Sequence, residues 1–431
     1  MNDPVRFFTD EAWTAGVIGL GYVGLPLGVT AVEAGLACVG FDVAPERVAG
    51  LRAGRSPVED VTDTQLRKAL DDGIEFTSDP QRLADADAVF VCVPSPLGRN
   101  REPDMRFIRA AADIVSEVVR PGQLVSLEST TYPGTTEEII LTAVTSGGLH
   151  LDEEVFVAFS PERVSPGGKL KTAEIPKVVG GVTPRSGSVA AAAYRRIVPA
   201  VHVVSSTRAA EMTKLLENTY RAVNIGLINE MAQLAHELDI DIWEVVAAAA
   251  TKPFGYQAFF PGPGVGGHCI PLDPQFLAWR AKEANFATRF IDLAEQVNSN
   301  MPSYTAGRVA DLLNGRGLPV FGTEILGVGI AYKPNVADDR ESASLHVLDE
   351  LRKRGASVSV LDPLVDPERV RYHGYRPVTP GDDLSGFSAA VILTDHDGLD
   401  LEGIAAAVPA VFDARGAYRR RGLEPANVTA L

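Results

Sequence analysis

Cysteine is scarce in this sequence of 431 residues, which holds only Cys38, Cys92 and Cys269. An odd number of widely spaced cysteines, with no CxxC pair, argues against a disulfide framework and against a zinc site. Such sparse use of cysteine is typical of proteins that work in a reducing compartment. We therefore expect a cytoplasmic protein without structural disulfides and without a bound metal.

Long apolar runs and positive charge are also lacking. No stretch of about 18 uncharged apolar residues occurs, so we expect no membrane span. The first residues, MNDPVRFFTDEAW, carry acids and have no apolar core, which argues against a signal peptide. The net charge is −16, and a nucleic-acid groove needs clustered Lys and Arg to neutralise phosphates. We expect no nucleic-acid partner, although a small anionic ligand needs only a few local donors.

The residues that are present predict an α/β protein of more than one domain. Hydrophobic residues make up 45% and charged residues 22%, which is typical of a folded globular chain. In residues 1–205, short apolar runs alternate with helical stretches such as 105–119, which predicts a parallel doubly wound sheet. The apolar runs are 15–20, 86–94, 123–130, 154–161 and 177–181.

The rest of the chain divides into two further regions. Residues 206–314 are mainly helical, with one or two long helices over 206–238 and a Gly/Pro-rich interruption at 251–274. Residues 315–431 return to the first pattern, with a glycine turn after a strand within 320–334, a helix near 342–354 and a strand that ends at Asp362. Two more strands are expected within 389–396 and 410–415. The fold class is therefore two Rossmann-like doubly wound domains joined by a long helical segment.

A glycine motif stands where the first predicted strand meets the first long helix. It reads Gly19-Leu20-Gly21-Tyr22-Val23-Gly24, and Asp42 ends the next strand. Glycines here allow a tight turn and close approach of a pyrophosphate to the helix N-terminus. An acid at the second strand end accepts bonds from ribose hydroxyls and repels a 2′-phosphate. A tight turn alone also needs glycine, but the full arrangement predicts NAD as the cofactor.

Cys269 lies in a second glycine-rich segment, Gly266-Gly267-His268-Cys269-Ile270-Pro271-Leu272-Asp273. A loop of this composition exposes a thiol, and Asp273 can orient water or a neighbouring base. The alternative is a buried structural thiol, which suits Cys38 and Cys92 because each lies in an apolar strand. Both readings stay open for Cys269, and His268 is given no role.

Polar residues also gather at strand ends and on the long helix. Lys214 and Asn218 stand four apart and share a helix face, where a solvated lysine and a turn-satisfied asparagine are the alternative. Residues 128–131 and 160–163 follow predicted strands, whose carboxyl ends bind ligands in open α/β sheets. Helix capping explains the same residues equally well.

Seven collinear motifs resemble the UDP-glucose/GDP-mannose dehydrogenase family over nearly the whole chain. They are GVIGLGYVGLPL, VPSPL, ESTTYPGTT, SPERVSPG, KLLENTYRAVNIGLINE, GPGVGGHCIPLDP and GVGIAYKPNVADDRES. Residues 251–274, together with LESTTYPGTTEE, are most similar to the branch that oxidises UDP-N-acetylglucosamine. The resemblance implies an NAD-binding domain over 1–205, a dimerising helical region over 206–314 and a nucleotide-sugar domain over 315–431.

The resemblance also implies roles for individual residues. The implied catalytic set is Cys269, Lys214, Asn218, Asp273, Glu162 and Thr130. In it the thiol is the nucleophile, the lysine and asparagine stabilise an oxyanion, the aspartate and threonine position water, and the glutamate takes part in acid–base work. The implied cofactor contacts are Gly19, Gly21, Tyr22, Val23, Gly24, Asp42, Arg47, Pro94, Ser95, Thr130 and Arg340. The implied substrate contacts are Glu162, Arg163, Val164, Lys214, Asn218, Phe260, Gly266, Gly267, Lys333 and Arg415.

The implied reaction is an NAD-dependent four-electron oxidation of a nucleotide-sugar C6 alcohol to the acid, through a thioester on Cys269. The sequence departs from the family pattern in three places: Pro166 replaces a second acid, Leu272 replaces a lysine, and Val164 and Ser165 replace acids of the N-acetylglucosamine branch. Leu272 points away from UDP-glucose, whereas Val164 and Ser165 leave the sugar and the base unsettled. UDP-glucose, dTDP-glucose and UDP-N-acetylmannosamine stay open as alternative substrates. A two-electron hydroxyacid dehydrogenase and a non-catalytic NAD-sensing protein are the alternatives of other classes. We expect a homodimer or a higher homo-oligomer.

Overall fold

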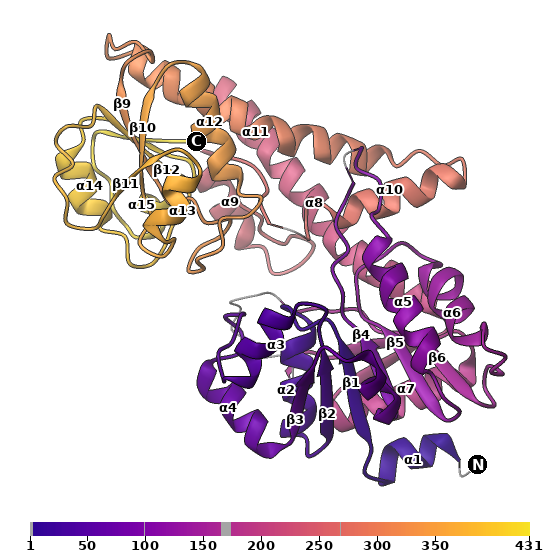
Figure 1. Cartoon of the computed structure of the whole chain (residues 1–431). Helices are drawn as coiled ribbons and strands as arrows, with labels where there is room; N and C mark the ends of the chain where they lie inside the picture. The colour runs from indigo at the N-terminus through magenta and orange to yellow at the C-terminus, as the bar shows by residue number, and fades with distance from the viewer. Residues whose placement is uncertain (1–2, 99, 165–173, 268) are drawn as a thin grey trace. The chain divides into compact units, whose positions relative to one another are not determined.

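The computed structural model describes residues 3–98, 100–164, 174–267 and 269–431. The chain forms two compact units. The first unit comprises Met1–Glu217 and Gln275–Phe286, and the second comprises Asn218–Pro274 and Ala287–Leu431. Each unit contains one sheet with helices around it, and the strands are coloured indigo to magenta in the first unit and orange to yellow in the second (Figure 1).

The first unit is built on an eight-stranded sheet in the order β3-β2-β1-β4-β5-β6-β7-β8. All neighbouring strands are parallel except the pair β6 and β7. The strands are β1 Thr14–Ile18, β2 Ala37–Phe41, β3 Ile74–Thr77, β4 Ala88–Val91, β5 Gln123–Leu127, β6 Val155–Phe159, β7 Lys177–Gly181 and β8 Val201–Val204. The helices are α1 Pro4–Asp10, α2 Gly24–Glu33, α3 Pro45–Arg52, α4 Asp63–Asp72, η1 Pro80–Asp85, α5 Arg106–Val118, η2 Thr136–Leu141, α6 Thr142–Thr145 and α7 Pro184–Ile197.

Strand β4 shows why apolar runs form the centre of this sheet. Ala88 and Phe90 belong to one buried cluster, whereas Val89 and Val91 belong to another. Successive side chains of a strand point to opposite faces, so a strand covered by helices on both faces must be apolar throughout. The sequence run 86–94 therefore predicted a strand in the right place, although β4 ends at Val91.

The second unit repeats this plan with six parallel strands in the order β11-β10-β9-β12-β13-β14. The strands are β9 Glu324–Val328, β10 Ser357–Leu361, β11 Arg376–Val378, β12 Ala389–Ile392, β13 Val411–Asp413 and β14 Val428–Ala430. The helices beside them are α12 Ala343–Lys353, α13 Pro367–Tyr372, α14 Leu401–Ala407 and α15 Ala417–Arg420. The side chains of β12 alternate between two buried clusters, as those of β4 do.

Four further helices lie between the two sheets in the sequence. They are α8 Thr207–Glu237, α9 Ile242–Ala250, α10 Asp273–Glu283 and α11 Arg289–Asn314. In the second unit α8 packs closely on α11, since a Cβ added at Gly226 would lie 3.0 Å from the Cα of Ala294. The region 206–238 is thus a single helix. In the part of the chain that the structure describes, no helix is long and apolar enough to cross a membrane.

The predicted fold class is confirmed, with one difference in detail. The antiparallel pair β6 and β7 departs from the all-parallel sheet expected for residues 1–205. An antiparallel neighbour can be reached without the crossover helix that a parallel neighbour requires, and a strand–helix alternation does not reveal such a step. In both sheets the strand order reverses, beside β1 and β4 and beside β9 and β12, where ligands of open α/β sheets bind.

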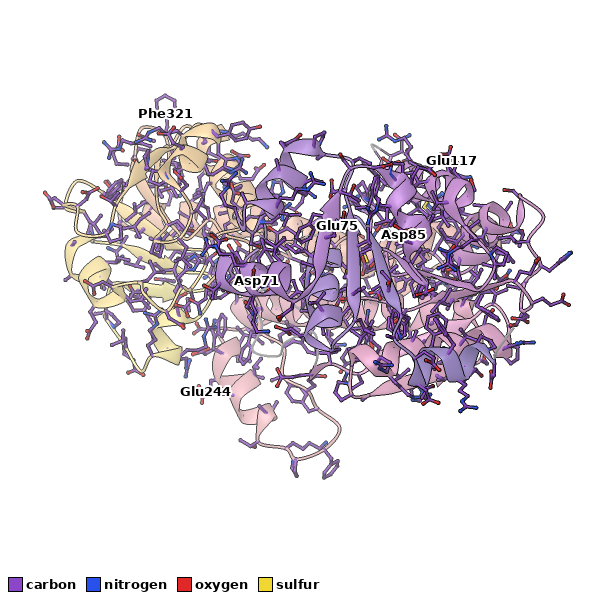
Figure 2. The ribbon with its side chains drawn as sticks, turned by 60° about the horizontal axis from the view of Figure 1, so that its bottom comes forward. Asp71, Glu75, Asp85, Glu117, Glu244 and Phe321 are labelled. Carbon is purple, nitrogen blue, oxygen red and sulfur yellow. The ribbon has the colours of Figure 1, made fainter. Side chains whose placement is uncertain are left out.

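Part of the negative charge of the chain lies on the surface of the first unit. Figure 2 labels Asp71, Glu75 and Asp85, which belong to α4, β3 and η1. Arg82 pairs with Glu75 at 2.9 Å and with Asp85 at 3.2 Å. One guanidinium is therefore shared between two carboxylates, and this surface stays acidic.

Candidate active site

The three positions of the first motif are occupied by glycine for different structural reasons. Gly19 has φ +92°, and a Cβ there would lie 2.7 Å from the carbonyl oxygen of Cys92. A Cβ on Gly24 would lie 1.9 Å from the carbonyl oxygen of Gly19, so the turn itself requires both glycines. A Cβ on Gly21 would meet nothing within 4 Å. The protein's own packing therefore does not explain Gly21, and the open space beside it is consistent with the predicted close approach of a dinucleotide.

Asp42 follows β2 and is buried, with its carboxylate directed at the glycine turn. Its Oδ2 accepts a hydrogen bond from Leu20 N at 3.0 Å, and its Oδ1 accepts one from Ala44 N at 3.0 Å. Arg47 donates to Oδ2 at 3.2 Å. The carboxylate keeps acceptor capacity beyond these three bonds, since it has about four lone-pair positions. This geometry fits an acid that binds ribose hydroxyls of NAD.

Two more segments with predicted cofactor residues meet at the carboxyl edge of the same sheet. Pro94 and Ser95 follow β4, and Thr130 follows β5. Ser129 joins the segments because its hydroxyl donates to the carbonyl oxygen of Val93 at 2.7 Å. The exposed ring of Tyr22 lies in the glycine turn, next to Val23. These segments therefore lie at the carboxyl edge of the sheet, beside the point between β1 and β4 where the strand order reverses, and their cofactor contacts stay a prediction.

The segment 161–164 is fixed to α8 by two contacts within the first unit. Lys214 Nζ donates to the carbonyl oxygen of Glu162 at 2.5 Å. Arg163 binds Glu217 at 2.6 and 3.2 Å and donates to the carbonyl oxygen of Pro176 at 2.7 Å. The guanidinium of Arg163 is thus engaged within the protein, where it holds the loop that carries Glu162.

The carboxylate of Glu162 is held by its own loop. Its Oε1 accepts hydrogen bonds from Arg163 N at 2.7 Å and from Val164 N at 2.5 Å. The loop backbone thus fixes the position of this carboxylate, and its acid–base role stays a prediction. Ser165, Pro166 and His268 lie outside the described residues.

The loop that carries Cys269, residues 262–272, is called the thiol loop and belongs to the second unit. Cys269 is exposed there. Gly267 has φ +84°, its N–H donates to the carbonyl oxygen of Glu341 at 3.2 Å, and a Cβ on it would lie 2.8 Å from the ring of Tyr332. A Cβ on Gly266 would be 3.1 Å from Tyr332. The two glycines therefore let the loop lie directly on the 330–341 segment and present the thiol at its end.

Asp273 joins the thiol loop to α8. Its backbone N–H donates to the carbonyl oxygen of Cys269 at 2.9 Å, and its Oδ2 accepts a hydrogen bond from Asn218 Nδ2 at 2.5 Å. Asp273 begins α10, where the helix N-terminus favours an anionic side chain. The structure therefore brings Asn218, Asp273 and Cys269 together within the second unit, and their catalytic roles stay a prediction.

The predicted substrate cations have different surroundings. Arg415 Nε donates to the carbonyl oxygen of Leu393 at 2.6 Å, and a Cβ on Gly262 would lie 2.6 Å from this guanidinium. Burial, and then the nearby Arg420, lower the pKa of Arg415 to about 10, so it stays charged at neutral pH. Lys333 lies with its Nζ 5.5 Å from the ring centre of Tyr332, the residue that contacts Gly267.

Arg340 and Phe260 each contact a neighbour within the second unit. Arg340 makes a two-pronged contact with Asp338, at 2.8 and 2.7 Å. Phe260 is half exposed and stacks on Trp243, with ring centres 6.0 Å apart. Both belong to the second unit, although the sequence assigned Arg340 to the cofactor. That assignment stays a prediction.

Two groups of buried polar residues were missed from the sequence. Asn229 Oδ1 accepts a hydrogen bond from Gly262 N at 3.0 Å, and its Nδ2 donates to Asn298 at 2.9 Å, so it fixes the start of the thiol loop. Lys177 pairs with Glu128 inside the first unit. A signal was available for each, since an asparagine interrupts the apolar stripe of α8 and a lysine opens a strand that is otherwise fully apolar.

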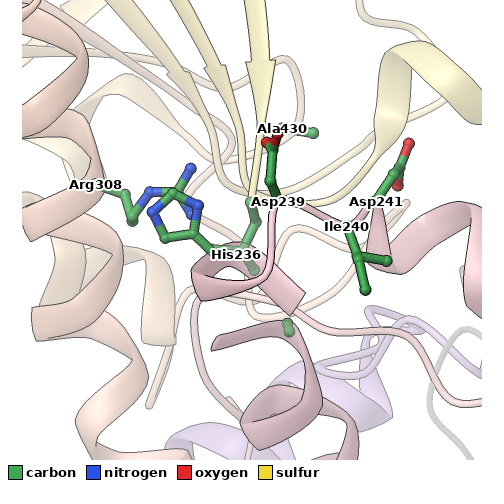
Figure 3. A pocket seen from close by; sticks show the side chains of 8 residues that line it. His236, Asp239, Ile240, Asp241, Arg308 and Ala430 are labelled. Atoms are coloured by element: carbon green, nitrogen blue, oxygen red, sulfur yellow. The ribbon is translucent and has the colours of Figure 1, made fainter. Parts of the chain in front are cut away.

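A separate pocket of about 280 Å³ lies at the end of α8 in the second unit (Figure 3). Its lining residues are Ala232, His236, Asp239, Ile240, Asp241, Arg308, Ala430 and Leu431. None of these eight is a predicted site residue. Among the described residues, no group of three or more His, Cys, Asp or Glu side chains is arranged to hold a metal ion.

These features define a dinucleotide-binding α/β protein that carries an exposed thiol in a glycine-rich loop. Comparison with known families matches residues 14–198 to the NAD binding domain, 208–300 to the central domain and 326–420 to the UDP binding domain of the UDP-glucose/GDP-mannose dehydrogenase family. The chain belongs to this family and is an NAD-dependent nucleotide-sugar dehydrogenase. This decides against the hydroxyacid dehydrogenase and the non-catalytic NAD sensor.

Individual relatives support the assignment. Protein CapL of Staphylococcus aureus is 37% identical over 82% of this chain and 83% of its own length. The UDP-N-acetyl-D-glucosamine 6-dehydrogenase of Pseudomonas aeruginosa is 35% identical over 90% of this chain and 92% of its own. The solved structure of the UDP-D-ManNAc dehydrogenase of Pyrococcus horikoshii is similar with a TM-score of 0.85, at 30% identity, covering 97% of this chain and 98% of that one.

Proposed function

We propose that the protein oxidises the C6 alcohol of UDP-N-acetylglucosamine to the carboxylate in a four-electron reaction, through a thioester on Cys269. The observation that carries this proposal is the contrast among the three thiols. Cys38 and Cys92 are buried, and burial raises the pKa of Cys38 to about 12 and that of Cys92 well above its usual value. Cys269 is exposed at the end of a loop shaped by glycines. Only a thiol that can form a thiolate acts as a nucleophile.

The residue types of the predicted catalytic set suit the chemistry of an acyl intermediate. Bound NAD supplies the hydride acceptor for both oxidations. Cys269 Sγ attacks the C6 aldehyde, and Lys214 and Asn218 are the candidate donors to the resulting oxyanion. One such donor contributes about 2.7–4 kcal/mol to transition-state stabilisation. Asp273 and Thr130 are the candidates for holding the water that hydrolyses the thioester, and Glu162 accepts its proton.

Binding of the nucleoside diphosphate requires cationic groups. Lys333 and Arg415 are our candidates, because both lie beside the loop that carries Cys269. Arg163 acts less directly, since its guanidinium already binds Glu217 and Pro176. We expect Arg163→Ala to disturb the position of Glu162 more than the affinity for the diphosphate.

The choice of sugar rests on the relatives. The Pseudomonas aeruginosa and Salmonella typhi relatives, 35% and 34% identical over 90% of this chain, are UDP-N-acetyl-D-glucosamine 6-dehydrogenases. A UDP-N-acetyl-D-mannosamine dehydrogenase of Methanococcus maripaludis is 34% identical over 88% of the chain, which makes that sugar the second candidate. We also propose a role in polysaccharide biosynthesis, where sugar acids of this kind are used.

The test is NADH formation with purified protein and a panel of four substrates: UDP-N-acetylglucosamine, UDP-N-acetylmannosamine, UDP-glucose and dTDP-glucose. The proposal predicts the highest kcat/KM with the first and about two NADH for each sugar consumed, since a four-electron oxidation releases two hydrides. A different preferred sugar would overturn the substrate assignment alone. One NADH per sugar, with aldehyde released, would overturn the thioester.

We further propose that the protein assembles at least as a dimer, through α8. Apolar side chains stay exposed along this helix at intervals of four to seven residues, namely Met212, Leu216, Tyr220, Leu227 and Leu234. Such a surface on a helix that already buries another face is typical of a protein–protein contact.

A further inference from the structure

A buried ion pair, Lys177 with Glu128, lies in the first unit close to Glu162, the predicted acid–base residue. Glu128 is 0% exposed and Lys177 is 4% exposed. Lys177 Nζ donates a hydrogen bond to Glu128 Oε2, and Tyr194 donates to Glu128 Oε1 at 2.7 Å. The Tyr194 hydroxyl also bonds to Ser126, at 2.9 Å. The cost of removing two charges from water can exceed the attraction between them, so a buried ion pair does not by itself stabilise the fold. This pair therefore needs a reason beyond packing.

The same ammonium faces a second carboxylate. Glu162 Oε2 lies 3.8 Å from Lys177 Nζ, while its Oε1 accepts from the backbone N–H groups of Arg163 and Val164. Lys177 therefore contacts two carboxylates: that of Glu128, which is fully buried, and that of Glu162, which lies at the carboxyl edge of the sheet. Glu128 and Glu162 raise the pKa of Lys177, although burial alone would lower it. The lysine is accordingly a permanent cation.

The other groups near Glu162 do not replace this cation. The guanidinium of Arg163 is neutralised by Glu217. Lys214 Nζ donates to the backbone carbonyl of Glu162 rather than to its carboxylate. Burial, and then Glu128, raise the pKa of Cys92, so this neighbouring thiol stays uncharged. Tyr194 is likewise kept neutral, because burial and Glu128 raise its pKa.

We propose that Lys177 is a positioning residue for Glu162. Its ammonium attracts the Glu162 carboxylate and holds it in place, and Glu128 limits this effect by competing for the same ammonium. The inference rests on the proposed acid–base role of Glu162 and adds to it the buried ion pair that faces its carboxylate. Opposite charges within about 4–6 Å favour the ionised form, and like charges disfavour it.

The proposal predicts shifts of opposite sign from two substitutions that break the same ion pair. Glu128→Gln removes the competing carboxylate, so the acidic limb of the pH profile of kcat/KM should move to lower pH. Lys177→Met combined with Glu128→Gln removes both buried charges, which protects the fold, and the limb should move to higher pH. Each shift should be about one pH unit. If the pair had only a structural role, both variants would lose activity or stability, but the acidic limb would not move in opposite directions.

Matched variants isolate the effect. Lys177→Arg keeps the charge and should restore a profile close to that of the wild type. Glu211 is another buried carboxylate of the same unit, which binds Gly134 and Thr136 rather than Glu162. Glu211→Gln should lower the thermal stability and leave the acidic limb in place.

The assay is NADH formation across pH with whichever nucleotide sugar is turned over, after thermal unfolding has shown each variant to be folded. Glu162→Gln is measured in parallel and should remove the acidic limb. If it does so but Glu128→Gln and the double variant shift the limb in the same direction, or not at all, the role of Glu162 stands and that of Lys177 is overturned. If Glu162→Gln keeps the acidic limb, the acid–base role itself is wrong and the inference is overturned with it.

Discussion

Asp42 gives the sharpest test of how the first unit selects its cofactor. Its carboxylate accepts hydrogen bonds from Leu20 N and Ala44 N and also holds Arg47 at 3.2 Å. Asp42→Asn keeps one oxygen acceptor and the shape of the side chain but removes the charge. We expect this change to release Arg47, whose guanidinium can then bind the 2′-phosphate of NADP.

The magnitudes follow from the bonds that are lost. A charge-assisted hydrogen bond contributes about 1.5–3 kcal/mol, so the loss of the ribose contact should weaken NAD binding about 10- to 100-fold. The ratio of kcat/KM for NADP to that for NAD should rise by a similar factor. Asp42→Ala also leaves the N–H groups of Leu20 and Ala44 without their acceptor. It should lower the free energy of unfolding by about 2 kcal/mol, and Asp42→Asn by about half of that.

The assay is the kinetics of NADH and NADPH formation, combined with thermal unfolding of both variants. Asp362→Asn is the matched control, because Asp362 also follows a second strand and accepts from a turn, but in the other unit. It should change stability and leave the ratio between the two cofactors unaltered. A stability loss in Asp42→Asn without any rise in the ratio would mean that Asp42 only supports the turn.

Three other expectations follow. Cys269→Ala should abolish acid formation, and iodoacetamide should label position 269 while the two buried cysteines stay unlabelled; full activity of the variant would refute the thioester. Light scattering should give at least twice the 45.9 kDa of one chain, and Leu227→Glu should reduce the mass; a wild-type monomer would refute assembly through α8. Asp362 has a pKa of about 2, because its bonds to His396 and to backbone N–H groups outweigh the effect of burial. Its contribution of about 2 kcal/mol should be complete above about pH 4 and lost as the pH falls toward 2, and an Asp362→Asn variant unfolded by urea should lack this dependence.

The sequence predicted the two sheets well because their central strands are buried on both faces. A strand such as β4 must then be apolar throughout, and four consecutive apolar residues between turn signals are visible in one dimension. The direction of β7 was missed, since pairing direction depends on the connection and not on the strand's own residues. The glycine turn and the thiol loop were found because most of their glycines, Gly21 excepted, are required by close contacts and therefore appear as a motif in the sequence.

The buried polar residues were harder to foresee. Lys177 and Glu128 are 49 positions apart in the sequence, and Asn229 and Asn298 are 69 apart. Each side chain alone is visible as a polar residue within an apolar stretch of sequence. Its partner cannot be identified there, because the fold brings the two together from distant positions. A lone lysine at the start of an apolar strand therefore predicts that a carboxylate exists, but not which one.

The two sheets also show where similarity of pattern ends. Each has an aspartate after its second strand, yet the two carboxylates have different acceptor capacity left. Asp362 Oδ2 accepts from Ile330 N at 2.7 Å, Ala331 N at 3.2 Å and His396 Nε2 at 3.3 Å, while Oδ1 accepts from Leu364 N at 2.9 Å and Val365 N at 3.0 Å.

His396 is fixed in this arrangement because its Nδ1 accepts from Asn335 N at 3.0 Å, which leaves the proton on Nε2 for Asp362. Five donors saturate a carboxylate that has about four lone-pair positions, whereas Asp42 has three. Asp42 therefore keeps capacity to accept a hydrogen bond from a ribose hydroxyl, whereas the carboxylate of Asp362 has none left. The UDP binding domain must recognise its nucleotide by other groups, and we expect the cations beside the thiol loop to supply them.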